Sequence, residues 1–168
     1  MHFIAGIALS VPVFAQAPAA GKAPEQVTFY GSPNSNISSG VVIPANRAVV
    51  WTSGTTPAPV NPQAPAGSRE RFGDTKTQAS SILNTLAQQL ERQGLTMKDV
   101  VYVRAYLVPD ATKGNKIDTE GWNAAYNEVF NTAANPTKTA RSTVGVTALV
   151  NADWLIEIEA FAVFPQSR

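Results

Sequence analysis

Three charged positions stand out in the last thirty residues of this chain, because they interrupt runs that are otherwise small or apolar. Arg141 lies in the run 139–146, and Glu157 and Glu159 lie in the run 155–162. Burying an unpaired charge in a strand is costly, so such residues usually have a partner or a function. An arginine and a glutamate on neighbouring strands can hold a small carboxylate and a water molecule. The pattern therefore predicts a site for a small anion.

The two glutamates are spaced to project from one face of a strand. Residues two apart in a strand point the same way and lie about 6.6 Å apart. Leu155, Phe161 and Val163 share this face with the glutamates. A face that mixes carboxylates with large apolar groups suits a cleft or a subunit interface, where desolvation raises a carboxylate pKa toward acid–base use. We expect Glu157 to carry chemistry and Glu159 to have a structural role.

The two runs are joined by a short turn segment, 151–153, and this predicts a closing β-hairpin. In such a hairpin Arg141 has two possible roles. Its guanidinium is a planar fork that can bind a substrate carboxylate through two charge-assisted hydrogen bonds. Alternatively, Arg141 pairs with Glu157 or Glu159 across the hairpin and only stabilises it.

The composition is that of a single globular domain. The chain has 168 residues, of which 44% are hydrophobic and 15% are charged, with a net charge of +1. Its lysines and arginines are scattered, which argues against a nucleic-acid-binding face. The sequence contains no cysteine and only one histidine, His2. A Ser-His triad and a His-based metal site are therefore excluded from a mature chain that has lost its N-terminal segment.

The N-terminal segment predicts export. Residues 3–14 form an apolar run that ends at Ala15-Gln16-Ala17, the pattern after which a signal peptidase cuts. Residues 1–17 are thus a predicted signal peptide, and the mature protein is expected to be periplasmic or secreted. No lysine or arginine precedes the run, so the alternative is an apolar strand or buried helix of the fold. Residues 18–26 are rich in Ala, Pro and Gly and are expected to be disordered.

Strand patterns occur before and between two helical segments. Residues 27–30, 38–43 and 47–53 predict strands, the last two on either side of a turn at 44–46. The proline-rich segment 57–67 predicts an irregular loop. A further strand is predicted at 99–107, and four of its residues are expected on one face. These are Val101, Val103, Ala105 and Leu107.

Helical periodicity is clear in residues 74–93, with Asp74 as the N-cap and Gly94 as the stop. A second helix is predicted at 119–130, with Trp122 and Tyr126 on its buried side. The order is then β-β-β-α-β-α-β-β within one domain, residues 27–166. This order predicts an α+β fold in which two helices pack on one face of a mixed sheet.

Five blocks, in the same order along the chain, resemble the YjgF/Rid family of small trimeric proteins, and the resemblance covers about residues 27–164. The blocks are Thr52-Ser53-Gly54 with Pro57, the segment 78–94 followed by Asp99-Val100-Val101, the segment 122–130, Ala140-Arg141-Ser142, and Glu157-Ile158-Glu159-Ala160. Any one block is a weak signal, whereas five in order are a specific one.

The resemblance implies a chorismate-mutase-like α+β fold, assembled as a homotrimer with clefts between subunits. It also implies a RidA-like enamine/imine deaminase, similar to 2-iminobutanoate/2-iminopropanoate deaminases, without a metal or an organic cofactor. In that case Arg141 holds the substrate carboxylate and Glu157 lies beside the hydrolytic water. We expect Ser53, Gly54, Asn123 and Thr143 to contact the substrate.

Four positions depart from the family pattern. Gly40 stands where the family has a cleft-lining tyrosine, and Tyr30 is a candidate to approach from another register. Thr55, Thr139 and Thr143 replace a frequent Gln, Pro and Cys. The substrate is therefore left open, as are two alternatives to catalysis. One is a non-catalytic trimer that binds small carboxylates in the periplasm. The other is a holdase-like interaction protein, for which Arg141 would be dispensable.

Overall fold

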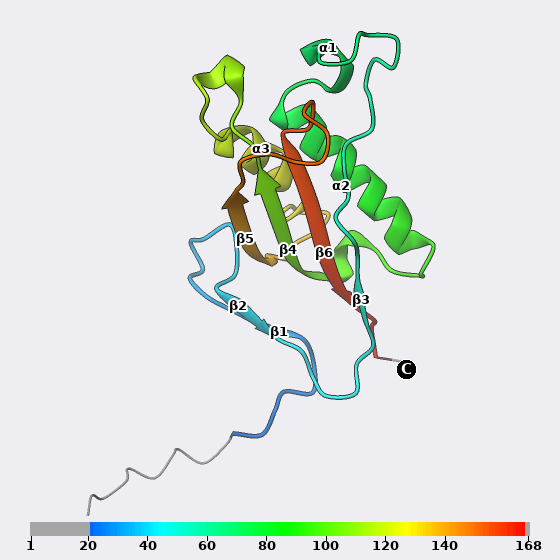
Figure 1. The fold of residues 1–168 in the computed structure, drawn as a ribbon. Coiled ribbons are helices and arrows are strands. Elements are labelled where there is room, and N and C mark those ends of the chain that lie inside the picture. Colours follow the sequence, from blue (N-terminus) through cyan, green and yellow to red (C-terminus); the bar gives the residue numbers. More distant parts are fainter. Residues whose placement is uncertain (1–20, 167–168) are drawn as a thin grey trace, which may run out of the picture.

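The computed structural model describes residues 21–166, and Figure 1 shows a mixed sheet flanked by helices. The predicted signal peptide lies outside the described residues, and residues 21–26 form neither helix nor strand. The strands are β1 (Thr28–Tyr30), β2 (Gly40–Val42), β3 (Val49–Trp51), β4 (Val100–Leu107), β5 (Ala140–Gly145) and β6 (Ile156–Val163). The helices are α1 (Arg69–Phe72), α2 (Thr75–Glu91) and α3 (Thr119–Val129), with short 3-10 turns η1 (Met97–Asp99) and η2 (Ala111–Lys113).

Four strands form the main sheet in the order β3-β6-β4-β5. β6 is antiparallel to both β3 and β4, whereas β5 runs parallel to β4. β1 and β2 pair separately as a small antiparallel sheet. Apart from the short α1 and the 3-10 turns, the predicted order of elements and the mixed α+β fold are confirmed.

The predicted closing hairpin is wrong, because β4 lies between β5 and β6. β4 is buried at five of its eight positions and forms ladders on both of its edges. The segment joining β5 to β6 crosses the end of β4 and is bonded to it there. Val146 N–H donates to Leu107 O, and Val108 N–H donates to Leu155 O. The turn at 44–46 likewise closes no hairpin, since β2 pairs with β1 and β3 pairs with β6.

The two long helices begin at the residues that the sequence predicts. Asp74 Oδ1 accepts a hydrogen bond of 2.8 Å from Thr77 N–H, and α2 is followed by Gly94, whose φ is +76°. Asp118 caps α3 by accepting from Gly121 N–H at 3.0 Å. α2 and α3 cover one face of the main sheet (Figure 1). Within the described residues, no helix has the length and apolar character needed to cross a membrane.

The core lies between these helices and the sheet. Ile82, Leu83, Leu86 and Leu90 of α2 pack there with Trp122, Tyr126 and Phe130 and with alternate residues of β4 and β6. The strand predicted at 99–107, which is β4, needs one correction at its start. A bulge between Val100 and Tyr102 places Val100 in the core cluster and leaves Val101 outside it.

Gln78 joins α2 to the start of β6 through a buried carboxamide. Its Nε2 donates to Gly73 O at 3.2 Å and to Asp153 O at 3.1 Å, and its Oε1 accepts from Leu155 N–H at 2.8 Å. The side chain is fully buried, so these three bonds satisfy groups that water does not reach. The start of β6 is therefore fixed to the helix independently of the loop before it.

Candidate functional site

Arg141 lies on the helix-covered face of the main sheet. Its register partner on β4 is Val103, which is in the core, so Arg141 points toward α3. Its Nη2 donates to Asn123 Oδ1 at 2.8 Å. The guanidinium carbon lies 4.5 Å from the centre of the Tyr126 ring and 5.4 Å from that of Trp122. These cation–π contacts and the Asn123 bond hold Arg141 in one orientation.

Burial lowers the pKa of Arg141, while the neighbouring Tyr126 acts in the opposite sense. An arginine remains charged in spite of such a shift. The bond to Asn123 uses one of its donors, and its other N–H groups bind no other described residue. The fork is therefore half-buried, charged and open to an anion. No ion pair within the described residues joins it to Glu157 or Glu159, so the purely structural pairing is absent.

Thr143 belongs to the same cluster. Its hydroxyl oxygen accepts a hydrogen bond of 3.1 Å from Trp122 Nε1, which leaves its proton available to donate. Thr139, which also departs from the family pattern, makes a different contact. Its hydroxyl lies 2.7 Å from that of Tyr126, and both residues are fully buried. The structure thus brings Arg141, Asn123 and Thr143 together, as expected for a carboxylate-binding cluster.

Glu157 lies on the opposite face of the sheet. Its strand neighbours Ile156 and Ile158 are in the core, so Glu157 projects from the face that the helices leave uncovered. A Cβ atom on Gly54 would overlap Glu157 Oε1. A side chain at position 54 would therefore have to displace the carboxylate from this position. Gly54 thus lies beside Glu157, and Ser53 precedes it in the chain.

Burial raises the pKa of Glu157, and the nearby charge of Glu159 raises it further. Glu159 has a charged partner instead: Arg104 Nη1 lies 3.6 Å from its Oε2. Desolvation and a neighbouring negative charge both favour the protonated form of Glu157, which is the direction needed for a group that exchanges protons. The two glutamates therefore differ in their surroundings: Glu157 lies against Gly54, and Glu159 lies near Arg104.

The two clusters do not face each other within one chain. Arg141 is on the helix-covered face of β5, and Glu157 is on the uncovered face of β6, with β4 between them. The expectation that neighbouring arms of one hairpin bring them together is wrong for this reason. β5 and β3 are the two edges of the main sheet, so each cluster lies toward a different edge.

At Gly40, which departs from the family pattern, the space that a side chain would take is occupied by Tyr30 of the paired strand β1. A Cβ on Gly40 would overlap the Tyr30 hydroxyl oxygen, so the ring lies over the glycine. Tyr30 is 58% exposed, and Ser38, two residues before Gly40, pairs with Ala140 at the start of β5. A tyrosine thus does reach this region from β1, although the sequence pattern alone leaves its position open.

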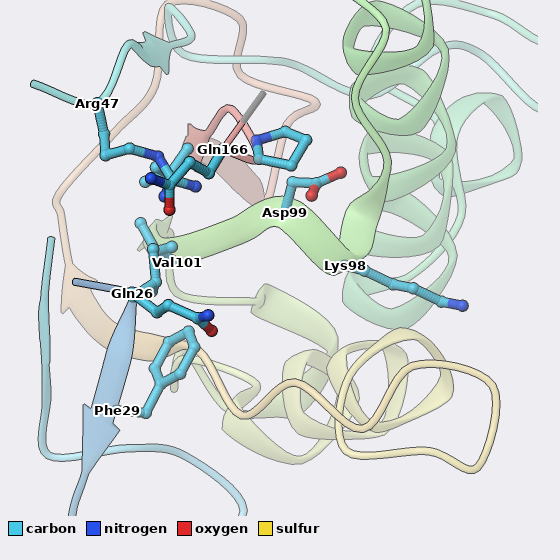
Figure 2. A pocket seen from close by; sticks show the side chains of 10 residues that line it. Gln26, Phe29, Arg47, Lys98, Asp99, Val101 and Gln166 are labelled. Atoms are coloured by element: carbon cyan, nitrogen blue, oxygen red, sulfur yellow. The ribbon is translucent and has the colours of Figure 1, made fainter. Parts of the chain in front are cut away.

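A separate cavity of about 370 Å³ lies between β1 and the bulge in β4 (Figure 2). Val101, displaced by the bulge, forms part of its wall together with Phe29. Arg47 donates from Nε and Nη2 to Phe164 O, and the ammonium group of Lys98 points away from the cavity. None of the predicted site residues lines it, so this cavity is distinct from both clusters.

The donor groups in both clusters belong to arginine, amide, hydroxyl and carboxylate side chains. Among residues 21–166, no group of three or more His, Cys, Asp or Glu residues is arranged to hold a metal ion. The clusters as they stand can bind a carboxylate at Arg141 and position a water molecule at Glu157. They lack a direct connection within one subunit.

Comparisons with known proteins agree with the fold. A family model described as Endoribonuclease L-PSP matches residues 33–164. A Rid-family protein of unknown function from Yersinia pestis is 23% identical, with a TM-score of 0.62 over 83% of this chain and 99% of that one. A YjgF/YER057c/UK114 family member from Mycobacterium tuberculosis is 24% identical, with a TM-score of 0.50 over 83% of this chain and 100% of the other.

A protein of unknown function from Pseudomonas aeruginosa is 25% identical, with a TM-score of 0.56 over 79% of this chain and 84% of that one. A comparison with curated protein sequences found no match. The structural matches span nearly the whole length of the related chains. They show that this chain shares the fold of these relatives.

Proposed function

Because the chain belongs to the endoribonuclease L-PSP family, which includes the YjgF and Rid proteins, we propose that it hydrolyses reactive enamine/imine intermediates to 2-keto acids and ammonia. The observation that carries this proposal is the Arg141 cluster. A charged, half-buried guanidinium is held by Asn123 and two aromatic rings, and its remaining donors bind no other residue within 21–166. Such a fork is suited to a carboxylate.

The reaction adds water across a C=N bond. Arg141 binds the carboxylate of a 2-imino acid, the tautomer of an enamine such as 2-aminoacrylate. Water attacks the imine carbon while Glu157 accepts a proton from it, and Glu157 then returns the proton to nitrogen. A second proton passes from the new hydroxyl group to the nitrogen, the C–N bond breaks as the C=O bond forms, and ammonia leaves, so imino acid plus water gives keto acid plus ammonia. The raised pKa of Glu157 supports this proton exchange.

A second copy of the chain supplies the missing half of the site in this proposal. If the β5 edge of one subunit lies beside the β3 edge of the next, Arg141 of the first approaches Gly54 and Glu157 of the second. Such a head-to-tail contact uses two different surfaces and closes into a ring, here a proposed homotrimer. The uncovered sheet face carries Trp51, which is 64% exposed and lies 4.3 Å from Phe161 between ring centres. An exposed aromatic face is typical of an assembly surface.

A coupled assay tests the function directly. Imines are generated in situ by an amino-acid oxidase or a serine dehydratase, and the release of keto acid is followed with and without the protein. Faster release is expected, together with a trimer in light scattering. An unchanged rate for every imine would refute the deaminase.

A non-catalytic carboxylate binder is the second candidate. It is favoured by the completeness of the Arg141 cluster within one chain, in contrast to the open surroundings of Glu157. Thermal stabilisation by 2-keto acids without turnover would support it. A holdase predicts instead that Arg141→Ala leaves the activity intact. RNA cleavage is disfavoured, because the only histidine is His2 and the basic residues are scattered.

The proposed location is the periplasm or the medium, after cleavage behind Ala17. The apolar run at 3–14 and the Ala15-Gln16-Ala17 pattern support it. N-terminal sequencing of the secreted fraction should give a chain that starts at Pro18. An intact Met1 in that fraction would refute the cleavage.

A further inference from the structure

Three alternate residues at the start of β5 each contact an aromatic side chain of α3. The hydroxyl oxygen of Thr139, just before β5, lies 2.7 Å from that of Tyr126. The guanidinium carbon of Arg141 lies 4.5 Å from the Tyr126 ring centre and 5.4 Å from that of Trp122. Thr143 accepts a hydrogen bond of 3.1 Å from Trp122 Nε1. The three side chains therefore share one face of an edge strand, with Thr143 two residues beyond Arg141.

The bond from Trp122 determines how the Thr143 hydroxyl group can be used. The indole ring is fully buried, so losing its acceptor would leave a buried donor unpaired. An indole N–H can only donate, so it takes a lone pair of the Thr143 oxygen. The hydroxyl proton must then point away from the indole, and none of residues 21–166 accepts it. Because Thr143 is exposed, this proton faces outward beside Arg141.

Arg141 and Thr143 can bind the same anion. Residues two apart on one face of a strand are separated by about 6.6 Å. Two hydrogen bonds of about 2.8 Å, one to each oxygen of a carboxylate, can bridge such a span. A carboxylate oxygen has two lone pairs, so an oxygen that binds the guanidinium can also accept from the hydroxyl group. The two side chains thus form one site, with a charged donor and a neutral donor.

We propose that Trp122 is a positioning residue for substrate binding: its N–H holds the Thr143 hydroxyl so that Thr143 donates to the carboxylate bound by Arg141. The choice of a 2-imino or 2-keto acid as the ligand rests on the proposed function. Trp122 does not contact the carboxylate in this arrangement and acts through Thr143. Without the indole N–H, the hydroxyl proton is distributed over several orientations, and the affinity for the anion falls.

Calorimetric titration with 2-ketobutyrate measures the effect on Kd. Thr143→Val keeps the shape of the side chain without the hydroxyl and should raise Kd by about tenfold, whereas Thr143→Ser should stay within about threefold of the wild type. Trp122→Phe keeps a buried ring without the N–H and should raise Kd by about threefold to fivefold. Trp154→Phe is the matched control, because Trp154 Nε1 is buried and binds no other described residue. It should leave Kd unchanged.

A double variant tests whether Trp122 acts through Thr143. In the Thr143→Val background, Trp122→Phe should change Kd by less than about twofold, because the hydroxyl that it positions is absent. Melting curves on the same samples show which variants are folded. If Trp122→Phe does not fold, the valine and serine variants at the exposed position 143 still test the hydroxyl. An unchanged Kd in Thr143→Val, equal effects of Trp122→Phe in both backgrounds, or no binding to the wild type would overturn the inference.

Kinetics with the imine of 2-aminobutyrate separates this inference from the deaminase function. Thr143→Val and Trp122→Phe should raise KM and leave kcat nearly unchanged, because the bond is made to the carboxylate and not to the reacting carbon. Turnover with the same KM in every variant would overturn the positioning role and leave the deaminase standing. No turnover in any variant, together with the expected changes in Kd, would refute the deaminase and leave the positioning role in place.

Discussion

The two faces of the main sheet differ in how much of a site each completes within one chain. On the helix-covered face, Arg141 is oriented by Asn123 and by two aromatic rings, and its other donors have no partner among the described residues. On the uncovered face, Glu157 fits against Gly54, and the described residues of the same subunit place no arginine of the Arg141 kind beside it. Binding is thus prepared by the fold of a subunit, whereas the proposed chemistry depends on assembly.

The largest effect is expected from removing the guanidinium. Arg141→Ala should lower kcat/KM for carboxylate-bearing imines by at least about 100-fold, because two charge-assisted hydrogen bonds of roughly 1.5–3 kcal/mol each are lost. Steady-state kinetics measures this loss. Arg92→Ala, in an exposed position just after α2, is the control. An undiminished rate in Arg141→Ala would show that the helix-covered face does not bind the substrate.

Mixing two inactive variants separates a shared site from one built within a chain. Arg141→Ala and Glu157→Gln subunits are co-expressed with different tags and purified as mixed oligomers. In every head-to-tail trimer that contains both variants, about one site in three combines an intact arginine with an intact glutamate. Activity should return to that extent. No recovery from mixed oligomers would contradict the division of the site between two subunits.

The variant Gly54→Ala tests the role of Glu157 on the uncovered face of the sheet. The added methyl group overlaps Glu157 Oε1 and must displace the carboxylate. We expect kcat to fall between about tenfold and 100-fold, since small displacements of a reacting group are costly, while the fold is retained. Gly145→Ala is the matched control, because its added Cβ would meet only Ile117, at 3.8 Å. Equal kcat values for the two variants would remove the role assigned to Glu157.

A smaller effect is expected at Asn123, which orients the arginine. Asn123→Ala removes the acceptor at 2.8 Å from Nη2. KM should rise by about threefold to tenfold, with kcat nearly unchanged, because one hydrogen bond is lost and the charge remains. Asn127→Ala is the control, as Asn127 lies one turn further along α3 and is exposed. A change in kcat alone would place Asn123 elsewhere in the reaction.

The smallest predicted effect is a change with pH in the free energy of unfolding, caused by Glu157. A raised pKa means that Glu157 ionises less readily in the folded protein than in the unfolded chain. Its contribution to stability is therefore present while it is protonated and is lost as the pH rises through the raised pKa. Glu157→Gln cannot ionise, so its stability relative to the wild type should increase from about pH 4 to pH 7.

Denaturant unfolding at both pH values measures this difference. Glu91→Gln, a change at an exposed position on α2, controls for the loss of one negative charge. If Glu157→Gln behaves like Glu91→Gln, burial does not disfavour the charged form of Glu157.

The sequence predicts the helices well because their signals are local. The Asp74 cap, the apolar face ending at Leu90 and the stop at Gly94 all lie within one segment and agree with one another. Strand pairing is less predictable because it depends on distant segments. The turn at 151–153 suggests a hairpin, but β4 offers a more buried strand to both β5 and β6.

The candidate site shows the same contrast between local signals, which the sequence reveals, and long-range pairing, which it does not. The types and spacing of Arg141 and Glu157 mark them as candidates without any structure, and the family resemblance adds Gly54. Their separation onto two faces could not be predicted, because it follows from the order of the strands. The contact of Arg141 with Tyr126 is not predicted either. Its only signal is a pair of aromatic residues four apart on α3, Trp122 and Tyr126, which equally fits a helix that packs on the core.

The buried carboxamide of Gln78 has a consequence for how this protein can diversify. It fastens both Asp153 and Leu155 to the first turn of α2, downstream of a loop whose Val150 is 96% exposed. Insertions and replacements between residues 147 and 151 are thus mechanically isolated from β6. Such changes can reshape the outer rim of the molecule while the carboxylate of Glu157 keeps its place.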